Sequence, residues 1–486
     1  MNVIVLMADT WRFDYLGCYG NEWIQTPNID KFARESVVFE NAYAEGCPTI
    51  PTRRALFSGR YTLPFRGWGP LAPEDLTIPD ILWSESIRTA LITDTAPMHM
   101  PKYGYERGFD FVQHFRGQEF DMFYQKDPCA LDIEDYHVPV FKPGSGGKKE
   151  ELPASIFARH ELEGFLPQRQ FWKSDQDQMA ARVCKAAMNY LEQVDKNKPF
   201  FLWMDSFDPH EPWDPPSVWN PDIKCPYDPD YKGREIILPV PTFVEGYLSE
   251  AEMHHIRMLY AEKITMVDKW LGKVLDKIKA QGLFENSLII FLSDHGQPLG
   301  NGKHGHGIIR KCRPWPYEEL THIPLIVHHP DGHRGRVSSF VETVDVAPTI
   351  MDFLNVDNQT DQMQGKSLLP LVRGETDKVR DFAICGYFNF SWSIVTDEWS
   401  YVHWLDAKKV SDPMKLMTLF GKGQIEEKTD IWTCTPGSIA ETPVEDELYD
   451  RQKDPFQLVN LRDQKADIGK ALYQQLREYM MSLRIS

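Results

Sequence analysis

The chain has 486 residues, which is long enough for a large core and a second, smaller domain. Its formal net charge of −18 at pH 7 argues against nucleic acid or an anionic membrane surface as a partner. The 8 cysteines show no paired spacing, which predicts reduced thiols and a cytoplasmic location. No apolar run approaches the roughly 18 residues of a membrane span, and the first predicted strand begins at residue 2, so we expect neither a signal peptide nor a membrane partner.

The first predicted element is a strand at the start of the chain. Residues 2–8 form a continuous apolar run, which is typical of a strand buried on both faces of a parallel sheet. Asp9 follows this run directly. Ligands of open α/β sheets bind beyond the carboxyl ends of the strands, so Asp9 is predicted to be either a helix cap or a ligand.

A second informative run begins at Thr49. Residues 49–60 predict a tight turn that leads into a helix, with Pro51 at the first helical position and Gly59 just past the last turn. The unpaired N–H groups and positive dipole end of a helix start can hold an oxyanion, which suits a covalent nucleophile at Thr49. Taken alone, the Thr-x-Pro pattern would favour Thr49 as a simple helix cap. The acidic residues that follow two of the predicted strands favour the nucleophile.

Helices and long loops are predicted between the strands. The irregular stretch at about 113–174 is long for a loop, and we expect a lid, a specificity insert or a contact in a homo-oligomer. The proline-rich segment 209–241 is expected to border the site. A capping box at residues 249–252 starts the clearest helix, which runs towards Gly282.

The second acidic element comes late in the chain. Residues 287–293 form another apolar strand, and Asp294, His295 and Gly296 follow it. An aspartate and a neutral imidazole together make a good site for a divalent metal ion. Both acidic elements therefore place candidate ligands at the ends of buried strands.

Two structural units are predicted. Over residues 1–375, apolar strands alternate with amphipathic helices, which predicts an α/β domain whose mostly parallel sheet is covered by helices on both faces. Residues 376–486 are predicted to form a small C-terminal unit. Its short strands are expected at residues 382–386, 391–396 and 399–404, and its terminal helix at 464–483.

Several short motifs occur in a fixed order along nearly the whole chain. They are Met7-Ala8-Asp9-Thr10-Trp11-Arg12, Pro51-Thr52-Arg53 with Ser58-Gly59-Arg60, Gly108-Phe109-Asp110, Pro209-His210-Glu211-Pro212, Ser293-Asp294-His295-Gly296 and Glu447-Leu448-Tyr449-Asp450. In these motifs the chain resembles the sulfatases of the alkaline-phosphatase superfamily, whose close relatives include phosphonate and phosphodiester hydrolases. The resemblance implies an alkaline-phosphatase-like α/β fold with a small C-terminal antiparallel subdomain. It also implies a metal-dependent ester hydrolase whose substrate is a small anionic ester.

The chain departs from the sulfatase pattern at the nucleophile. Sulfatases carry Cys-x-Pro-x-Arg, whose cysteine becomes formylglycine, and alignment on Pro51 and Arg53 puts Thr49 at the cysteine position. Cys47 lies two residues too early, and Cys312 lacks the required arginine, so we expect no formylglycine. A threonine ester must be cleared by water at the central atom, which is routine for a phosphoryl group and slow for a sulfuryl group. We therefore favour phosphate monoesters, phosphate diesters or phosphonates. The alternatives are a sulfatase without formylglycine, a phosphotransferase, and a non-catalytic binding protein on the same fold.

The resemblance also implies a metal site. Asp9, Asp294 and His295 would hold one divalent metal ion that also binds Thr49 Oγ. Thr10 stands where many relatives have a further ligand, which favours Mn, Zn or Mg over Ca. A second metal ion would need the candidate set Asp208, His210, His304 and His306, but an ordinary glycine-rich loop around the last two is the favoured interpretation.

The remaining implied roles concern the substrate. Arg53 would contact the oxyanion or Thr49, and His210 the transferred group or the leaving oxygen, unless His210 is only packed among nearby tryptophans and prolines. His99 keeps the histidine of a family segment whose lysine is missing here, which weakens the sulfatase interpretation. Lys303 is assigned to the anion, with Lys311 as the alternative.

Overall fold

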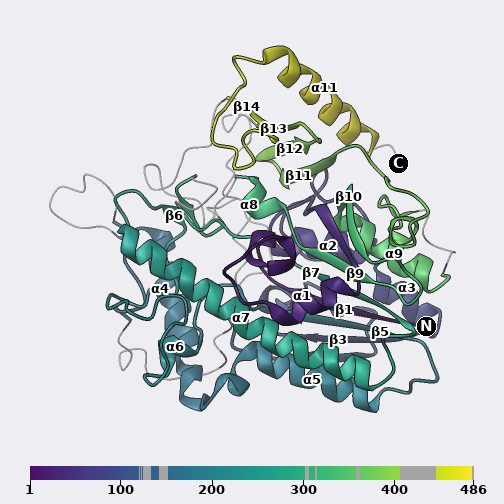
Figure 1. Cartoon of the computed structure of the whole chain (residues 1–486), viewed down its shortest axis with the longest axis horizontal. Helices are drawn as coiled ribbons and strands as arrows, with labels where there is room; N and C mark the ends of the chain where they lie inside the picture. The colour runs from purple at the N-terminus through teal and green to yellow at the C-terminus, as the bar shows by residue number, and fades with distance from the viewer. Residues whose placement is uncertain are drawn as a thin grey trace.

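The computed structural model describes residues 1–119, 121, 123, 133–141, 151–300, 306–311, 315–356, 362–405 and 445–483. A sheet of 8 strands runs through the large part of the molecule (Figure 1). In spatial order its strands are β10 (Gly335–Glu342), β2 (Val37–Tyr43), β9 (Leu325–His328), β7 (Ser287–Leu292), β1 (Asn2–Ala8), β5 (Phe200–Ser206), β3 (Arg88–Thr93) and β4 (Phe111–His114). β9 is antiparallel to β2 and β7, and the other neighbouring pairs are parallel. The predicted α/β fold with a mostly parallel sheet is confirmed.

Helices cover both faces of this sheet. Along β1, Val3, Val5 and Met7 belong to the core on one face, and Ile4 and Leu6 to the core on the other. This alternation follows from the two-residue period of a strand, and burial on both faces explains why β1 is apolar throughout. The first face is covered by α2 (Thr49–Ser58), α3 (Ile78–Ser84), α9 (Val346–Phe353) and α10 (Leu369–Val372). The second is covered by α1 (Pro27–Arg34), α4 (Pro153–Phe165), α5 (Met179–Gln193) and α7 (Glu250–Ala280).

Two predicted helices can be compared with their sequence signals. α7 begins after Ser249, whose side chain accepts a hydrogen bond from the Glu252 backbone, so the capping box is confirmed. α2 begins at Thr49 itself with Pro48 in the capping position, so Pro51 is its third residue and the prediction of a first position was wrong. Gly59 ends α2 in the left-handed region, at φ 64°, as expected for a residue without a Cβ.

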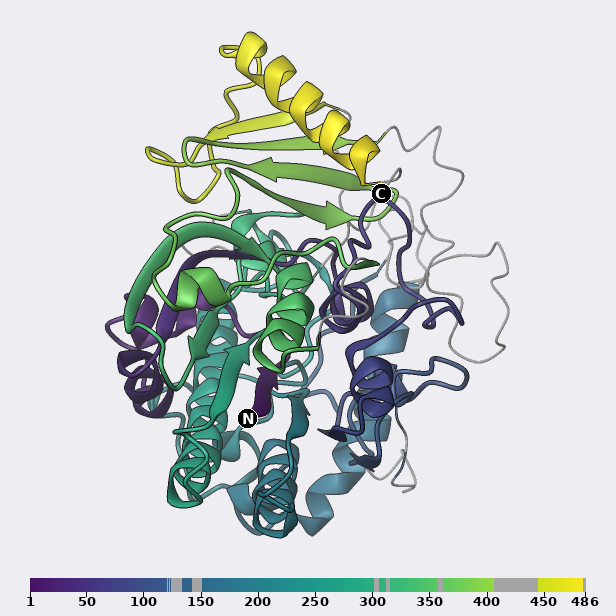
Figure 2. The same ribbon diagram turned by 90° about the vertical axis from the view of Figure 1, so that its right-hand side faces the viewer.

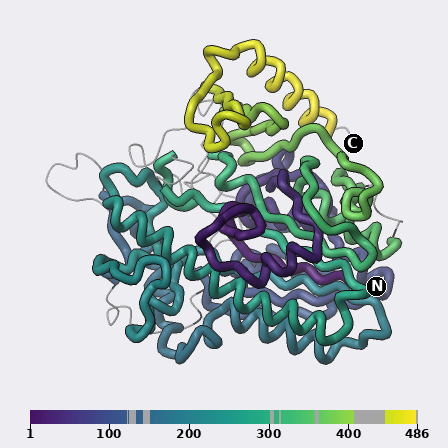
Figure 3. Tube along the Cα trace, viewed as in Figure 1, coloured from purple at the N-terminus to yellow at the C-terminus, as the bar shows by residue number. Residues whose placement is uncertain are grey.

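The C-terminal unit is a second, antiparallel sheet. It consists of β11 (Ala383–Tyr387), β12 (Ser391–Val395), β13 (Trp399–Trp404) and β14 (Glu447–Asp450) in sequence order. α11 (Ala466–Ser482) lies across one face of the sheet (Figure 2), where Leu472, Leu476 and Met480 are buried with strand residues. The small sheet lies beside the β10 edge of the large one, because β11 contacts both β2 and β10. The tube in Figure 3 shows the green and yellow C-terminal part of the chain at the top of the molecule. The boundary near residue 375 stays a prediction.

Shorter elements connect these layers. They are η1 (Phe13–Tyr15), η2 (Gly17–Tyr19), η3 (Ala96–His99), η5 (Leu166–Phe171), η6 (Asp175–Asp177), α6 (Pro216–Trp219), β6 (Thr242–Phe243), β8 (Ile308–Ile309), α8 (Glu318–Thr321) and η7 (Thr343–Asp345). Within the predicted insert at 113–174, the described residues include α4 and η5. Among the helices of the described ranges, none combines the length and apolar character that a membrane crossing requires.

Candidate active site

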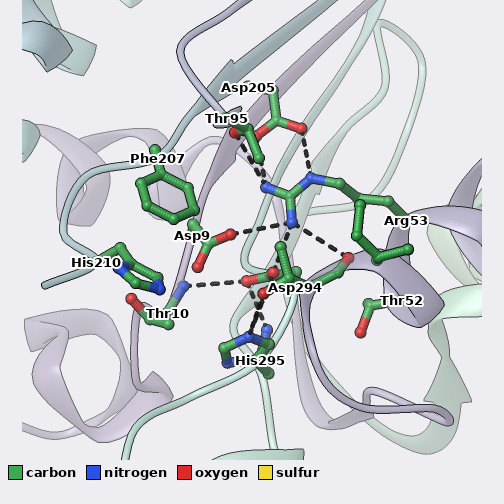
Figure 4. A network of polar contacts seen from close by, with 12 residues as sticks. Asp9, Thr10, Thr52, Arg53, Thr95, Asp205, Phe207, His210, Asp294 and His295 are labelled. Carbon is green, nitrogen blue, oxygen red and sulfur yellow. Dashed lines mark hydrogen bonds and ion pairs between the residues drawn. The ribbon is translucent and has the colours of Figure 1, made fainter. Parts of the chain in front are cut away.

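Three neighbouring strands of the large sheet end at one place. β1 lies between β5 and β7, and the register pairs Met7 with both Asp205 and Leu292. Asp9 and Asp294, which follow β1 and β7, therefore meet beyond the carboxyl edge of the sheet (Figure 4). The sheet topology explains why residues almost 300 positions apart in the sequence share one site.

Asp9, Asp294 and His295 form a group that could hold a metal ion. Each offers a ligand atom, these atoms lie within 4.8 Å of one another, and all three residues are fully buried. Among the described residues, Asp9 Oδ1 and Thr10 Oγ1 have no hydrogen-bond partner, and Asp9 Oδ2 has only the ion pair with Arg53. Buried carboxylates without donors are rare unless a cation binds them, so these residues fit a divalent metal ion.

The neighbouring backbone orients Asp294. Its Oδ1 accepts hydrogen bonds from the backbone N–H groups of Thr10, at 3.0 Å, and His295, at 2.9 Å. Oδ1 is thus occupied by the backbone, and Oδ2 of Asp294 lies 2.7 Å from Arg53 Nη1. The segments that follow β1 and β7 therefore hold each other in place.

His295 is held in the form that a metal requires. Its Nδ1 lies 2.7 Å from the carbonyl oxygen of Gly296, which can only accept, so Nδ1 carries the proton and Nε2 has a free lone pair. Burial lowers the pKa of His295 to about 4, so the imidazole is neutral at neutral pH. A side chain at Gly296 would place its Cβ 2.1 Å from the Glu319 carbonyl oxygen, which explains the glycine after the Asp-His pair.

Arg53 binds the carboxylates of the site. Its Nη1 lies 3.0 Å from Asp9 Oδ2 and 2.7 Å from Asp294 Oδ2. Its Nε and Nη2 bind the two oxygens of Asp205 at 2.9 and 2.7 Å, in the bidentate geometry that suits a guanidinium. Three aspartates thus surround one arginine, a surplus of carboxylates that suits a divalent cation. Burial, followed by the nearby Asp294 carboxylate, raises the pKa of Asp9 well above its usual range.

Sequence reasoning missed Asp205. It lies in β5 and is fully buried, and it also accepts a hydrogen bond from Thr95 Oγ1 at 2.8 Å. The signal was present, because β5 is an apolar strand that ends in Asp205-Ser206 beside β1. The strand-end rule that selected Asp9 and Asp294 would also have selected Asp205.

Thr49 lies beside Asp9, Asp294 and His295, which are called the metal-ligand group below because they are the candidate metal ligands. Its Oγ1 is 3.3 Å from His295 Nε2, and the Thr49 carbonyl oxygen is 3.3 Å from Arg53 Nη1. Pro48 occupies the capping position of α2, so the helix-cap alternative for Thr49 was wrong. The start of α2 thus brings a hydroxyl to the candidate metal ligands.

His210 and Lys311 lie next to each other at this edge of the sheet. His210 is buried and stacks on Phe207, with ring centroids 4.0 Å apart. Its Nδ1 lies 2.5 Å from the Glu211 carbonyl oxygen and therefore donates, so Nε2 is an acceptor and receives a hydrogen bond from Lys311 Nζ. Burial holds the pKa of His210 well below its usual range, which keeps the ring neutral. Of the two candidate lysines, Lys311 lies in the described part of the chain and contacts His210.

Other predicted site residues lie apart from the metal-ligand group or outside the described residues. His99 Nδ1 is 2.6 Å from Glu106 Oε1, and the His99 ring stacks on His114 at 3.6 Å. Lys303 and His304 lie outside the described residues. His306 Nε2 pairs with the Phe456 carbonyl oxygen at 3.2 Å, and Asp208 pairs with Lys263 at 2.8 Å. Within the described ranges, His306 and Asp208 therefore each pair with a different protein residue, and the second metal site stays a prediction.

Comparisons with known proteins identify the family of this chain. Residues 1–356 match the family model described as Sulfatase, and residues 305–425 match the model of the N-sulphoglucosamine sulphohydrolase C-terminal region. An arylsulfatase of Clostridium perfringens is 26% identical, with 88% of this chain and 92% of that protein covered. The multifunctional alkaline phosphatase superfamily protein PehA of Trinickia caryophylli is 27% identical, with 76% of this chain and 77% of that protein covered.

Solved structures show the same fold. The phosphonate monoester hydrolase of Agrobacterium radiobacter superposes with a TM-score of 0.66 at 22% identity, and the match covers 100% of this chain and 95% of that one. The sulfatase model covers far more than half of the chain, and the matched residues include the nucleophile position and all three candidate metal ligands. The chain therefore belongs to the sulfatase family of ester hydrolases.

Proposed function

We propose that this protein is a metal-dependent hydrolase of phosphate monoesters, phosphate diesters or phosphonates, with Thr49 as the covalent nucleophile. The observation that carries the proposal is the position of Thr49 Oγ1, 3.3 Å from His295 Nε2 and beside the buried candidate metal ligands Asp9, Asp294 and His295. A small anionic ester is the substrate class that such a site would take, because the bound cation and Lys311 both attract an anion.

The residues of the site have separate tasks in this proposal. Asp9, Asp294 and His295 hold the divalent ion, for which Mn, Zn or Mg are the favoured identities. When bound, the ion lowers the pKa of a coordinated hydroxyl and neutralises charge on a non-bridging oxygen. Arg53 keeps Asp9 and Asp294 in position, because its guanidinium binds both carboxylates.

Thr49 loses its hydroxyl proton to solvent, and its Oγ forms a bond to phosphorus while the bond from phosphorus to the leaving oxygen breaks. Lys311, which donates a hydrogen bond to His210 Nε2, would protonate or bind the leaving oxygen. Water then attacks the phosphorus of the threonine ester and releases Thr49. A sulfated threonine would be cleared slowly by this route, since threonine cannot release the group by breaking its own C–O bond.

A sulfatase that works without formylglycine is the second candidate. The family model and the arylsulfatase of Clostridium perfringens support it, whereas PehA and the phosphonate monoester hydrolase support the phosphorus esters. A phosphotransferase would use the same threonine ester with an acceptor other than water. A non-catalytic binding protein is less favoured, because Asp9, Asp294, His295 and Arg53 are all present. A cytoplasmic location is proposed from the cysteine pattern alone.

The test is a substrate panel with metal-loaded protein. p-Nitrophenyl phosphate, bis(p-nitrophenyl) phosphate, p-nitrophenyl phenylphosphonate and p-nitrophenyl sulfate are compared after loading with Mn, Zn, Mg or Ca. Repeated turnover of a phosphorus ester, with a phosphorylated Thr49 trapped by rapid quench and located by mass spectrometry, is the expected result. Sustained turnover of the sulfate with none of the phosphorus esters would reverse the preference.

A further inference from the structure

Glu119 is a buried carboxylate next to His210 that the proposed mechanism does not use. Its side chain is buried at the start of the predicted insert, and its Oε1 lies 3.7 Å from His210 Nε2. In the described part of the chain, Glu119 Oε2 has no hydrogen-bond partner. A buried carboxylate oxygen without a donor is unfavourable, so a group that supplies a donor would be bound there with a gain in free energy.

Two contacts hold the chain just before Glu119. Gln118 Nε2 donates to Asp94 Oδ2 at 2.9 Å, next to the end of β3. On the other side, the Gly117 carbonyl oxygen accepts from Gln168 Nε2 of η5 at 3.1 Å. Glu119 itself has φ 49°, a left-handed conformation that a residue with a side chain adopts at a cost. The surroundings therefore hold the Glu119 carboxylate in the interior.

His210 does not satisfy Glu119. The proton of His210 lies on Nδ1, where it is donated to the Glu211 carbonyl oxygen, so Nε2 has no hydrogen to give. Lys311 already fills the acceptor position at Nε2. Two acceptors at 3.7 Å make no hydrogen bond, so Glu119 is not explained as a residue that orients His210.

The nearby cations serve another carboxylate. Arg310 Nε lies 2.7 Å from Glu211 Oε1, and Lys311 Nζ lies 3.9 Å from the same atom. Within the described ranges, neither cation has an ion pair with Glu119. Burial raises the pKa of Glu119 to about 7, and the partial compensation by Lys311 shows that Glu119 feels the charge of the candidate active site.

We infer that Glu119 is a specificity-determining residue whose Oε2 accepts a hydrogen bond from a hydroxyl or ammonium group on the leaving alcohol of the substrate. The inference rests on the proposed function, because it needs an ester whose anionic part lies at the metal ligands. The leaving part then lies on the side of His210 and Lys311, next to Glu119. The substrate class is thus an ester of an amino alcohol or a polyol, and a leaving group with a second anionic group is repelled.

Matched esters test this preference without any mutation. The 2-aminoethyl, 2-hydroxyethyl and ethyl esters of whichever group the protein transfers differ only in the donor on the leaving alcohol. We expect kcat/KM for the 2-aminoethyl or 2-hydroxyethyl ester to exceed that for the ethyl ester by at least about tenfold, as for other sites that hydrogen-bond a substrate donor. Equal values for the three esters would overturn the inference.

Variants locate the preference at Glu119. Glu119→Gln keeps the shape but offers an amide, and the ratio of kcat/KM for the 2-aminoethyl and ethyl esters should fall by about tenfold. Glu161→Gln is the matched control, because Glu161 is also buried and also has no hydrogen-bond partner among the described residues, but its Oε2 forms an ion pair with Arg310 Nη2 at 3.9 Å. This variant should keep the ratio. The inference is wrong if Glu119→Gln lowers kcat/KM equally for all three esters. It is also wrong if Glu161→Gln changes the ratio of kcat/KM as much as Glu119→Gln does.

Failure of the proposed function gives a different pattern. In that case the metal-loaded wild type hydrolyses neither the alkyl esters nor any p-nitrophenyl ester of phosphorus or sulfur. If the p-nitrophenyl esters are hydrolysed and the wild type does not distinguish the alkyl esters, only the assignment of Glu119 fails. The wild-type comparison also decides the matter if Glu119→Gln does not fold.

Discussion

The two sides of the candidate active site are built differently. Asp9, Asp205 and Asp294 come from the ends of the adjacent strands β1, β5 and β7, and all three are fully buried. On the other side, Glu119 and Lys311 lie in connecting segments, and residues next to them lie outside the described ranges. Strand ends are positioned by the ladder of the sheet, whereas loops are positioned by their own side-chain contacts.

This difference separates chemistry from specificity. The strand-end side presents the candidate metal ligands in a geometry that the sheet imposes, and Thr49 lies beside them at the start of α2. The loop side presents the groups that would contact the leaving alcohol, and these can change without disturbing the sheet. Variants on the strand-end side should therefore affect every substrate, and variants on the loop side should affect some substrates more than others.

The largest expected effect is at the nucleophile. Thr49→Ala should lower kcat by at least about 10³-fold for every substrate, because the covalent route is lost. The matched control is Thr49→Ser, which keeps the hydroxyl and should retain far more activity. Steady-state kinetics and a thermal melt of both variants check this. Activity of Thr49→Ala within a few-fold of the wild type would remove Thr49 from the mechanism.

The metal ligands come next. Asp294→Asn or His295→Ala should lower metal content and activity together, with a loss in metal affinity of about 10²-fold. Elemental analysis after dialysis against a defined metal concentration measures occupancy, and kinetics on the same samples measures activity. Full activity after exhaustive chelation, with metal shown to be absent, would exclude the proposed site.

Asp205 tests whether Arg53 is a positioning residue. Asp205→Asn removes the charge that holds two nitrogens of Arg53 and should lower kcat/KM by about tenfold for all substrates, through Asp9 and Asp294. A weaker affinity for Mn or Zn in isothermal titration should accompany the loss. An unchanged metal affinity with reduced activity would show that Asp205 acts in another way.

Lys311 tests the loop side. Lys311→Met should lower kcat/KM by about tenfold for alkyl esters, whose leaving oxygen needs a proton, and by much less for p-nitrophenyl esters. The dependence of log(kcat/KM) on leaving-group pKa measures this directly. An equal loss of kcat/KM for all leaving groups would show that Lys311 affects every substrate, as the strand-end residues are expected to do.

The smallest expected effect is a gain of sulfatase activity. Thr49→Cys completes Cys-x-Pro-x-Arg, and co-expression with a formylglycine-generating enzyme would install the aldehyde. We expect little gain with p-nitrophenyl sulfate, because the lysine that sulfatases use near His99 is absent. Mass spectrometry verifies the conversion before the assay. A large gain in sulfate turnover would show that breakdown of a sulfated threonine limits the wild type, and that the pocket is built for sulfate.

Much of the strand-end side could be predicted from the sequence. The apolar runs at 2–8 and 287–293 match β1 and β7, and the residues after them, Asp9, Asp294 and His295, form the metal-ligand group. Parallel sheets bury their central strands on both faces and gather ligands at the carboxyl edge, so a local pattern is enough. Asp205, at the end of β5, follows the same rule.

Other features depended on the tertiary structure. Arg53 binds three aspartates and Lys311 contacts His210, and both contacts join segments far apart in the sequence. Among the described residues, Glu119 Oε2 also has no hydrogen-bond partner. No local pattern specifies them, because a long side chain in a loop selects its partner from whatever the fold brings near. The sequence by itself determined the family, the sheet and the ligand types at the strand ends. The packing of loops against the sheet decided which charged side chains pair, because a buried polar group is stable only when a protein residue or a bound ligand pairs with it.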